Sequence, residues 1–183
     1  IYANSKFRTD FMDVYLGAKC FFCISTGTGI DEVCNVFNRP VALISAPVGD
    51  LRTWKNNFLL LTKKHYSFEE KKYLSLSEIF IYGVGLCFNT KEYEKRGVKL
   101  INFEPKEIKE FALEMVEILT SKNNFDQEDI FLQNKFKKVF QENIRKYGNE
   151  KNKILPRLAS PLHGLLVATF SRKFLKKNKW WLE

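Results

Sequence analysis

Residues 20–45 read CFFCISTGTGIDEVCNVFNRPVALIS, and this segment gives the strongest indication of the fold. An apolar run typical of a buried strand leads into a hydroxyl-rich loop with two glycines, and apolar residues at helical spacing follow the loop. An Asn-Arg-Pro turn then precedes VALIS, which is typical of a short strand covered on both faces. A helix over residues 10–18, with Thr9 or Asp10 as its N-cap, comes before the segment. This order of elements predicts an α/β fold with a parallel sheet flanked by helices.

The rest of the chain alternates between extended and helical signals. FLLL and VKLINF indicate strands, and KEYEKRG indicates a short helical turn that ends at Gly97. LSLSEIFIYG predicts a helix with Ser75 or Ser77 as its cap, and Pro105 suits the first position of a long helix that continues to Leu119. The last predicted helix carries one apolar stripe, made of Leu132, Phe136, Val139, Phe140, Ile144 and Tyr147.

The loop at residues 25–31, STGTGID, has the composition of an anion cradle. It joins the end of a predicted buried strand to the start of a helix, where unpaired N–H groups and a partial positive charge favour phosphate. Gly27 and Gly29 allow close approach, and the hydroxyls of Thr26 and Thr28 add donors. The loop is neither a Walker loop nor a dinucleotide fingerprint, because no Gly-Lys-Ser/Thr follows it and a glutamate stands at the last glycine position.

A plain strand-to-helix turn is the alternative interpretation of the same loop. Thr28 and Asp31 have capping-box spacing, and we expect Asp31 to act mainly in starting the helix and less as a sugar contact. The cradle interpretation adds a diphosphate ligand at the carboxyl end of a parallel strand, where open α/β sheets place their ligands.

Charge is distributed unevenly along the 183 residues, which carry a net charge of +9. Residues 1–134 hold 17 Lys/Arg and 18 Asp/Glu, whereas residues 135–183 hold 13 Lys/Arg and 3 Glu. We therefore divide the chain into an α/β domain, 1–126, and a basic helical tail, 127–183, that packs on this domain or on an amino-terminal domain outside this sequence. A cationic tail with terminal tryptophans also suits an anionic membrane surface. No zinc pattern or RNA-binding motif indicates nucleic acid.

The cysteines, histidines and lysines give weaker signals. Cys20 and Cys23 have CxxC spacing within a predicted strand, which points them to opposite faces, so we expect reduced core thiols and no metal site. A lone histidine such as His65 or His163 is typical of a structural residue. Lys63 and Lys64 could reach a phosphate or an acceptor, although a solvated strand end is the simpler interpretation.

Several blocks resemble one protein family. The segment RTDFMDVYLGAKCFFCISTGTGIDEVCNVFNRPVALISAP, residues 8–47, is similar to a family of bacterial proteins described as glycosyltransferases of surface polysaccharide synthesis. FLLLTKK, GVKLINFEPKEI and the terminal LHGLLVATFSRKFLKKNKWWL resemble later blocks of the same family. The likeness is densest in the first block and thinner to the end of the chain.

The resemblance implies a Rossmann-like, carboxyl-terminal donor-binding half of the two-domain GT-B architecture. It assigns the donor diphosphate to Thr26, Gly27, Thr28 and Gly29, and the nucleoside to Asp10 or Asp13. Arg8 would neutralise phosphate or pair with one of those carboxylates. His163 lies in the terminal block that resembles the family, which makes it the better of the two histidines as a candidate for an interdomain or donor contact. GT-B transfer needs no Asp-x-Asp metal site, none occurs here, and no cofactor is expected beyond the nucleotide-diphosphate sugar. The catalytic base would belong to the amino-terminal domain, and the catalytic residues stay unassigned.

The function expected from these signals is transfer of a sugar from a nucleotide sugar to a glycan or lipid-linked acceptor, in the cytoplasm or at the inner face of the cytoplasmic membrane. An epimerase acting on nucleotide sugars is a second enzymatic possibility on the same scaffold. A non-catalytic carbohydrate- or partner-binding module, with the glycine loop as a simple turn, is the alternative from another class.

Overall fold

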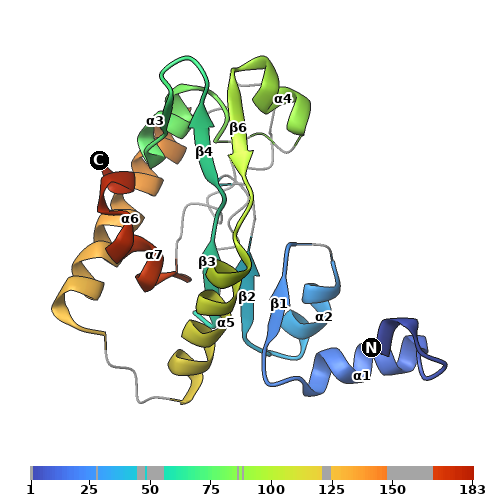
Figure 1. Cartoon of the computed structure of the whole chain (residues 1–183). Coiled ribbons are helices and arrows are strands. Elements are labelled where there is room, and N and C mark those ends of the chain that lie inside the picture. The colour runs from blue at the N-terminus through green and yellow to red at the C-terminus, as the bar shows by residue number, and fades with distance from the viewer. Residues whose placement is uncertain are drawn as a thin grey trace.

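A parallel four-stranded sheet forms the centre of the computed structural model (Figure 1). Its strands are β1 (Cys23–Ser25), β2 (Val41–Ile44), β3 (Phe58–Leu61) and β7 (Thr169–Phe170), in the order β1-β2-β3-β7. The structure describes residues 2–27, 29–44, 48, 56–85, 87, 89–120, 125–147 and 167–183. Helices flank the sheet, so the predicted α/β fold with a parallel sheet is confirmed.

The inner positions of β2 and β3 in the sheet explain why their sequences are uniformly apolar. Every residue of β2 and β3 is buried, because the strands pair with neighbours on both sides and are covered on both faces. Val41 lies beside Phe58, and Ile44 lies beside Leu61. These strands form part of a hydrophobic core that extends to the helices of the second half of the chain.

Helices α1 (Asp10–Lys19) and α2 (Ile30–Val36) lie at the β1 end of the sheet, after a short 3-10 turn, η1 (Tyr2–Asn4). The Thr9 side chain caps α1 by accepting the Met12 N–H, as one of the two predicted caps. The strand was expected from Cys20 but begins three residues later. Cys20 still donates its N–H to the Leu16 carbonyl and closes α1, so it belongs to the helix end.

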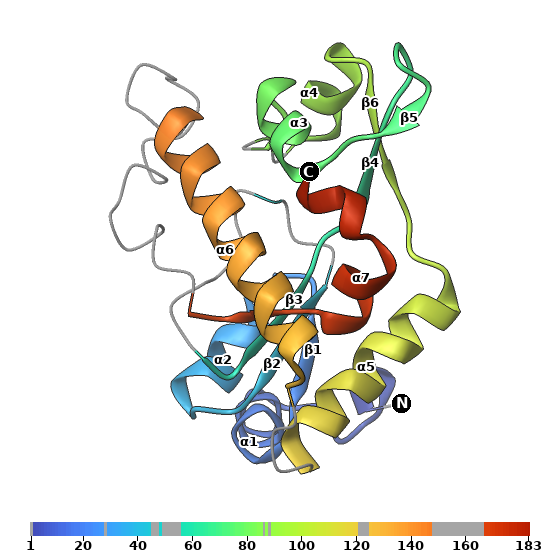
Figure 2. The same cartoon turned by 90° about the vertical axis from the view of Figure 1, so that its left-hand side faces the viewer.

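A second, antiparallel sheet was not predicted. It has the strand order β5-β4-β6 and lies beyond the carboxyl end of β3 (Figures 1 and 2). Its strands are β4 (Lys64–Ser67), β5 (Lys72–Tyr73) and β6 (Val98–Ile101), and helices α3 (Leu76–Ile81) and α4 (Thr90–Lys95) connect β5 to β6. Of the two candidate caps for α3, Ser75 is the one used, in a capping box with Glu78.

The carboxyl-terminal segment packs onto the α/β domain. Helix α5 (Pro105–Thr120) starts at the proline, as expected, and α6 (Gln127–Tyr147) carries the predicted apolar stripe toward the core. Gln133 of α6 bonds both backbone groups of Phe170 in β7, which is itself a strand of the parallel sheet. Helix α7 (Arg172–Lys177) and the 3-10 turn η4 (Lys179–Leu182) complete the chain. No helix in the described ranges is long and apolar enough to cross a bilayer.

Candidate functional site

The glycine loop lies where the sequence places it, between the carboxyl end of β1 and the start of α2. Gly27 and Gly29 have φ angles of 84° and 96°, a region that residues with a Cβ rarely adopt. Among the residues that the structure describes, a Cβ at Gly29 would meet no atom within 4 Å, and one at Gly27 would meet only Leu43 Cδ1 at 4.0 Å. The glycines are therefore required by backbone conformation, and no described atom crowds the Cβ position of Gly29.

Two N–H groups of the loop are already bonded inside the protein. The Gly27 N–H donates to Ser25 Oγ at 3.0 Å, and the Gly29 N–H donates to Asp31 Oδ1 at 2.9 Å. Asp31 is buried and accepts this bond at the start of α2, and its helix-start role stays a prediction. Helix α2 begins at Ile30 with Gly29 as its N-cap, one residue after the N-cap position that the spacing gives to Thr28. Thr26 is exposed, and Thr28 lies outside the described residues.

The residues expected to face the nucleoside are not brought to the loop. In both views α1 lies beside the amino end of β1, whereas the glycine loop lies at the carboxyl end of that strand (Figures 1 and 2). Arg8 takes the second role considered for it, because its Nε lies 3.6 Å from Asp13 Oδ2. Asp10 opens α1 in the same region. The donor-contact roles of these three residues stay predictions, and His163 lies outside the described residues.

Other polar groups gather where β3 ends. Lys63 Nζ donates to Asn102 Oδ1 at 2.9 Å, and Lys64 Nζ lies 3.0 Å from Glu107 Oε1 of α5. Thr62 is buried, and its Oγ1 has no hydrogen-bond partner in the described part of the chain. The two lysines are thus bonded to neighbouring side chains, and among the described residues Lys64 but not Lys63 forms an ion pair.

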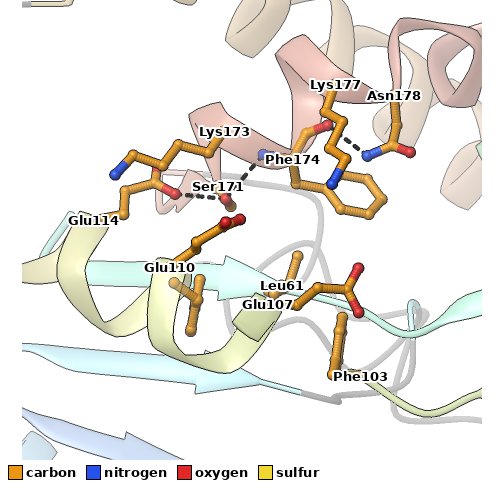
Figure 3. Close-up of a pocket in the computed structure, with 11 residues that line it drawn as sticks. Leu61, Phe103, Glu107, Glu110, Glu114, Ser171, Lys173, Phe174, Lys177 and Asn178 are labelled. Atoms are coloured by element: carbon orange, nitrogen blue, oxygen red, sulfur yellow. Dashed lines mark hydrogen bonds between the residues drawn. The ribbon is translucent and has the colours of Figure 1, made fainter. Parts of the chain in front are cut away.

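A small pocket lies between β3, α5 and α7 (Figure 3). Its volume of about 40 Å³ can hold water but is far below the several hundred Å³ of a typical ligand site. The buried Glu114 carboxylate beside it accepts the Ser171 hydroxyl at 2.6 Å and the Arg172 N–H at 2.7 Å. Burial raises the pKa of Glu114. The sequence had not indicated this carboxylate, and its contacts make it a structural link between α5 and α7.

The basic tail is partly neutralised within the protein. Lys173 pairs with Glu117 at 2.7 Å, Lys176 with Asp126 at 2.6 Å and Lys179 with Glu128 at 2.6 Å. Trp181 and Leu182 are buried in the core. Of the two terminal tryptophans, Trp181 therefore faces inward, whereas Trp180 is half-buried.

Three of the four cysteines, Cys20, Cys23 and Cys34, lie where α1, β1 and α2 meet, and Cys87 lies between α3 and α4. All four cysteines are free thiols, and Cys20 Sγ lies 4.0 Å from Cys34 Sγ. Burial raises the pKa of Cys34 to about 11, which makes it a poor nucleophile at neutral pH. Among the described residues no group of three or more His, Cys, Asp or Glu side chains could hold a metal ion.

His65 is a core residue of the second sheet. Its Nδ1 lies 3.0 Å from the Lys63 carbonyl, and its ring packs on Tyr93 with centroids 5.6 Å apart. Its Nε2 has no hydrogen-bond partner among the residues that the structure describes. Burial lowers the pKa of His65 to about 4, so the folded protein holds it neutral. No contact of His65 indicates a ligand.

This burial predicts a pH dependence of stability. Because the folded-state pKa lies below the ordinary 6.5, His65 stabilises the fold above pH 6.5, and this contribution is lost as pH falls toward 4. Between pH 7 and 4.5 the free energy of unfolding of the wild type should fall by about 2–3 kcal/mol more than that of His65→Phe. Urea titrations of both proteins at the two pH values measure this difference, and equal losses would contradict it.

No protein-family model, curated protein or solved structure shows a significant match to this chain.

Proposed function

We propose that this chain is the donor-binding part of a GT-B-type glycosyltransferase that moves a sugar from a nucleotide-diphosphate sugar to a glycan or lipid-linked acceptor. The observation that carries the proposal is the glycine loop at the carboxyl end of β1. Its two glycines have positive φ angles, and no described atom comes closer than 4.0 Å to their Cβ positions, which suits close approach of a diphosphate to the backbone. The resemblance of residues 8–47 to glycosyltransferases supports the same assignment.

Each loop residue has a distinct part in this proposal. Thr26 is exposed and offers a hydroxyl and an N–H group to the diphosphate. The Gly27 N–H becomes available when the Ser25 hydroxyl rotates away, a change of one side-chain torsion. The buried Asp31 keeps its bond to Gly29 and holds the shape of the loop. During transfer these donors would stabilise the charge that develops on the departing nucleoside diphosphate.

A binding module without catalysis is the second candidate, and one observation favours it. The N–H groups of Gly27 and Gly29 already have acceptors in Ser25 and Asp31, as in a self-contained turn. In that case the loop would bind no nucleotide, and the protein would act through another surface.

Calorimetry with GDP, UDP and their sugars tests the proposal. We expect one nucleotide to bind the wild type, and Gly29→Val to abolish that binding because the side chain fills the space above the loop. Gly97→Val is the matched control. Gly97 also has a positive φ, 65°, and no described atom lies within 4 Å of its Cβ position, so the backbone strain is similar while the loop is untouched.

The outcomes separate the candidate functions. Loss of binding in both glycine variants would indicate general destabilisation, and the absence of binding in the wild type would favour the module. Product analysis of the sugar nucleotide without an acceptor distinguishes transfer from epimerisation, because an epimerase converts the donor alone.

A further inference from the structure

A groove of about 470 Å³ lies between α4 and β6, and no residue of the glycine loop lines it. Its volume lies within the range of sites that hold small organic ligands. Helix and strand lie side by side, so α4 forms one wall of the groove and β6 forms the other (Figure 1).

The inner wall of the groove is apolar. Val98 and Tyr93 line it and are 0% and 3% exposed, and Leu100 beside them is half-buried. The Tyr93 hydroxyl already donates to the Cys87 carbonyl at 2.8 Å. Hydrogen bonds to a ligand therefore come from the polar side chains at the rim.

The rim of the groove carries exposed polar residues of mixed chemistry. Thr90 and Glu94 lie one turn apart on α4, while Lys99 belongs to β6 and Asn102 follows that strand. Together they supply a hydroxyl, a carboxylate, an ammonium and an amide. Sugar hydroxyls both donate and accept hydrogen bonds, so they match this mixture. An ionised phosphate only accepts, so it would find the carboxylate of Glu94 repulsive.

An aromatic ring and a cation lie at opposite ends of the groove. Phe68 is 57% exposed, and its N–H donates to the Gly97 carbonyl at 2.9 Å, which places it at the amino end of β6. Lys63 lies at the carboxyl end, where its Nζ donates to Asn102 Oδ1 at 2.9 Å. From Gly97 to Asn102 an extended chain spans roughly 16 Å. One sugar ring is too short to reach both ends, so a ligand that meets both contains several.

The charged residues of the groove favour a ligand with a single negative charge. Lys63 and Lys99 are positive and Glu94 is negative, so the lining has a net charge of +1. No ion pair joins any of the three to another residue that the structure describes. One carboxylate balances this charge.

We propose that this groove binds an acidic oligosaccharide of a few sugar units that carries one carboxylate. The carboxylate lies at Lys63, and a sugar ring at the other end packs on the exposed ring of Phe68. Hydroxyl groups between these ends bond Thr90 and Glu94. In the proposed transferase this ligand is the acceptor glycan. That role rests on the proposed function, whereas the binding itself does not.

The probe is aldotriouronic acid, in which one glucuronate is joined to xylobiose. It is compared with its neutral methyl ester and with acetate, which has a carboxylate but no sugar ring. In heteronuclear NMR titrations of the full chain, we expect the acid to shift the amide resonances of Thr90, Lys99 and Asn102. The ester should bind about tenfold more weakly, because it loses the charge-assisted bond to Lys63. Acetate should cause no shift at concentrations at which the acid saturates.

Two pairs of variants locate the ligand in the groove. Lys63→Gln should weaken binding of the acid about tenfold and leave that of the ester unchanged. Lys109→Gln should change neither, because this exposed lysine lies on α5 outside the groove. Phe68→Ala should weaken both ligands about tenfold. Phe21→Ala should weaken neither, although it removes a ring that is also 57% exposed, because Phe21 lies outside the groove.

Three results would overturn the proposal: no shifts with the acid, equal affinity of the acid and its ester, or shifts at the groove with AMP that exceed those with the acid. All three are measured on the wild type, so the test stays valid if a variant fails to fold. Gly29→Val should bind the acid normally. A chain that binds the acid but no nucleotide would refute the donor site alone, and one that binds a nucleotide but not the acid would refute the groove alone.

Discussion

Replacing Trp181 by alanine should lower the free energy of unfolding by about 3–5 kcal/mol. The indole is 1% exposed and lies within an aromatic cluster of the core. Its ring stacks on Phe136 and Phe170, with centroids 5.9 and 5.1 Å apart, and meets Phe174 edge-on at 5.3 Å. Alanine would remove these contacts and leave a cavity that the surrounding rings fill only in part. Urea unfolding followed by far-ultraviolet circular dichroism measures the loss.

The neighbouring Trp180 provides a matched control for this substitution. It is only half-buried, and its ring lies 6.3 Å from Tyr73 near the surface, so Trp180→Ala should cost about 1 kcal/mol or less. Similar losses in the two variants would contradict the core assignment of Trp181. A much larger loss for Trp181→Ala than for Trp180→Ala would show that the Trp181 side chain is held in the core. Both tryptophans could then contact a membrane only after η4 leaves the core.

The elements predicted best are those whose local pattern matches their final environment. Strands β2 and β3 could be predicted from four consecutive apolar residues each, because both faces of an inner parallel strand are buried. The long helices α5 and α6 could be predicted from periodicity, and Pro105 marked one start. In these segments the secondary structure that the local sequence favours is also the one found in the folded protein.

The parts that could not be predicted depend on distant partners. Strand β7 has two residues, Thr169–Phe170, and it exists because it pairs with β3, more than a hundred residues earlier. Strand β4 has the mixed sequence KHYS, and its pairing with β6 determines its extended form. The neutralisation of the tail depends on Glu117, Asp126 and Glu128, which are separated from their lysines by about fifty residues.

The candidate site shows the same division. The position of the loop after β1 and the requirement for two glycines follow from residue types. The bonds from Gly27 to Ser25 and from Gly29 to Asp31 depend on side-chain torsions that composition does not determine. The placement of α1 depends on contacts such as that of Gly17 with Val33, where an added Cβ would come within 2.9 Å. This close packing holds α1 against Val33 of α2 and away from the glycine loop.

Replacing Glu114 by alanine should also destabilise the protein by about 3–5 kcal/mol. Its carboxylate is fully buried and accepts the Ser171 hydroxyl and the Arg172 N–H at the start of α7. Without it, both donors lose their acceptor in a water-poor environment. The Arg172 Nε, 3.6 Å from the carboxylate, would also lose the nearest negative charge. Glutamine keeps one acceptor oxygen at this position, so Glu114→Gln should lose less than alanine does.

Glu117, one turn further along α5, makes the comparison specific for burial. Its side chain is 48% exposed and pairs with Lys173 at 2.7 Å, so Glu117→Ala should cost less than about 1 kcal/mol. The two substitutions remove the same chemical group from the same helix, and only one removes it from a buried site. If urea unfolding gave equal losses for both, Glu114 could not be the link that holds α7 to α5. If only Glu114→Ala were severe, the segment that contains Trp181 would depend on two independent anchors, one polar and one aromatic.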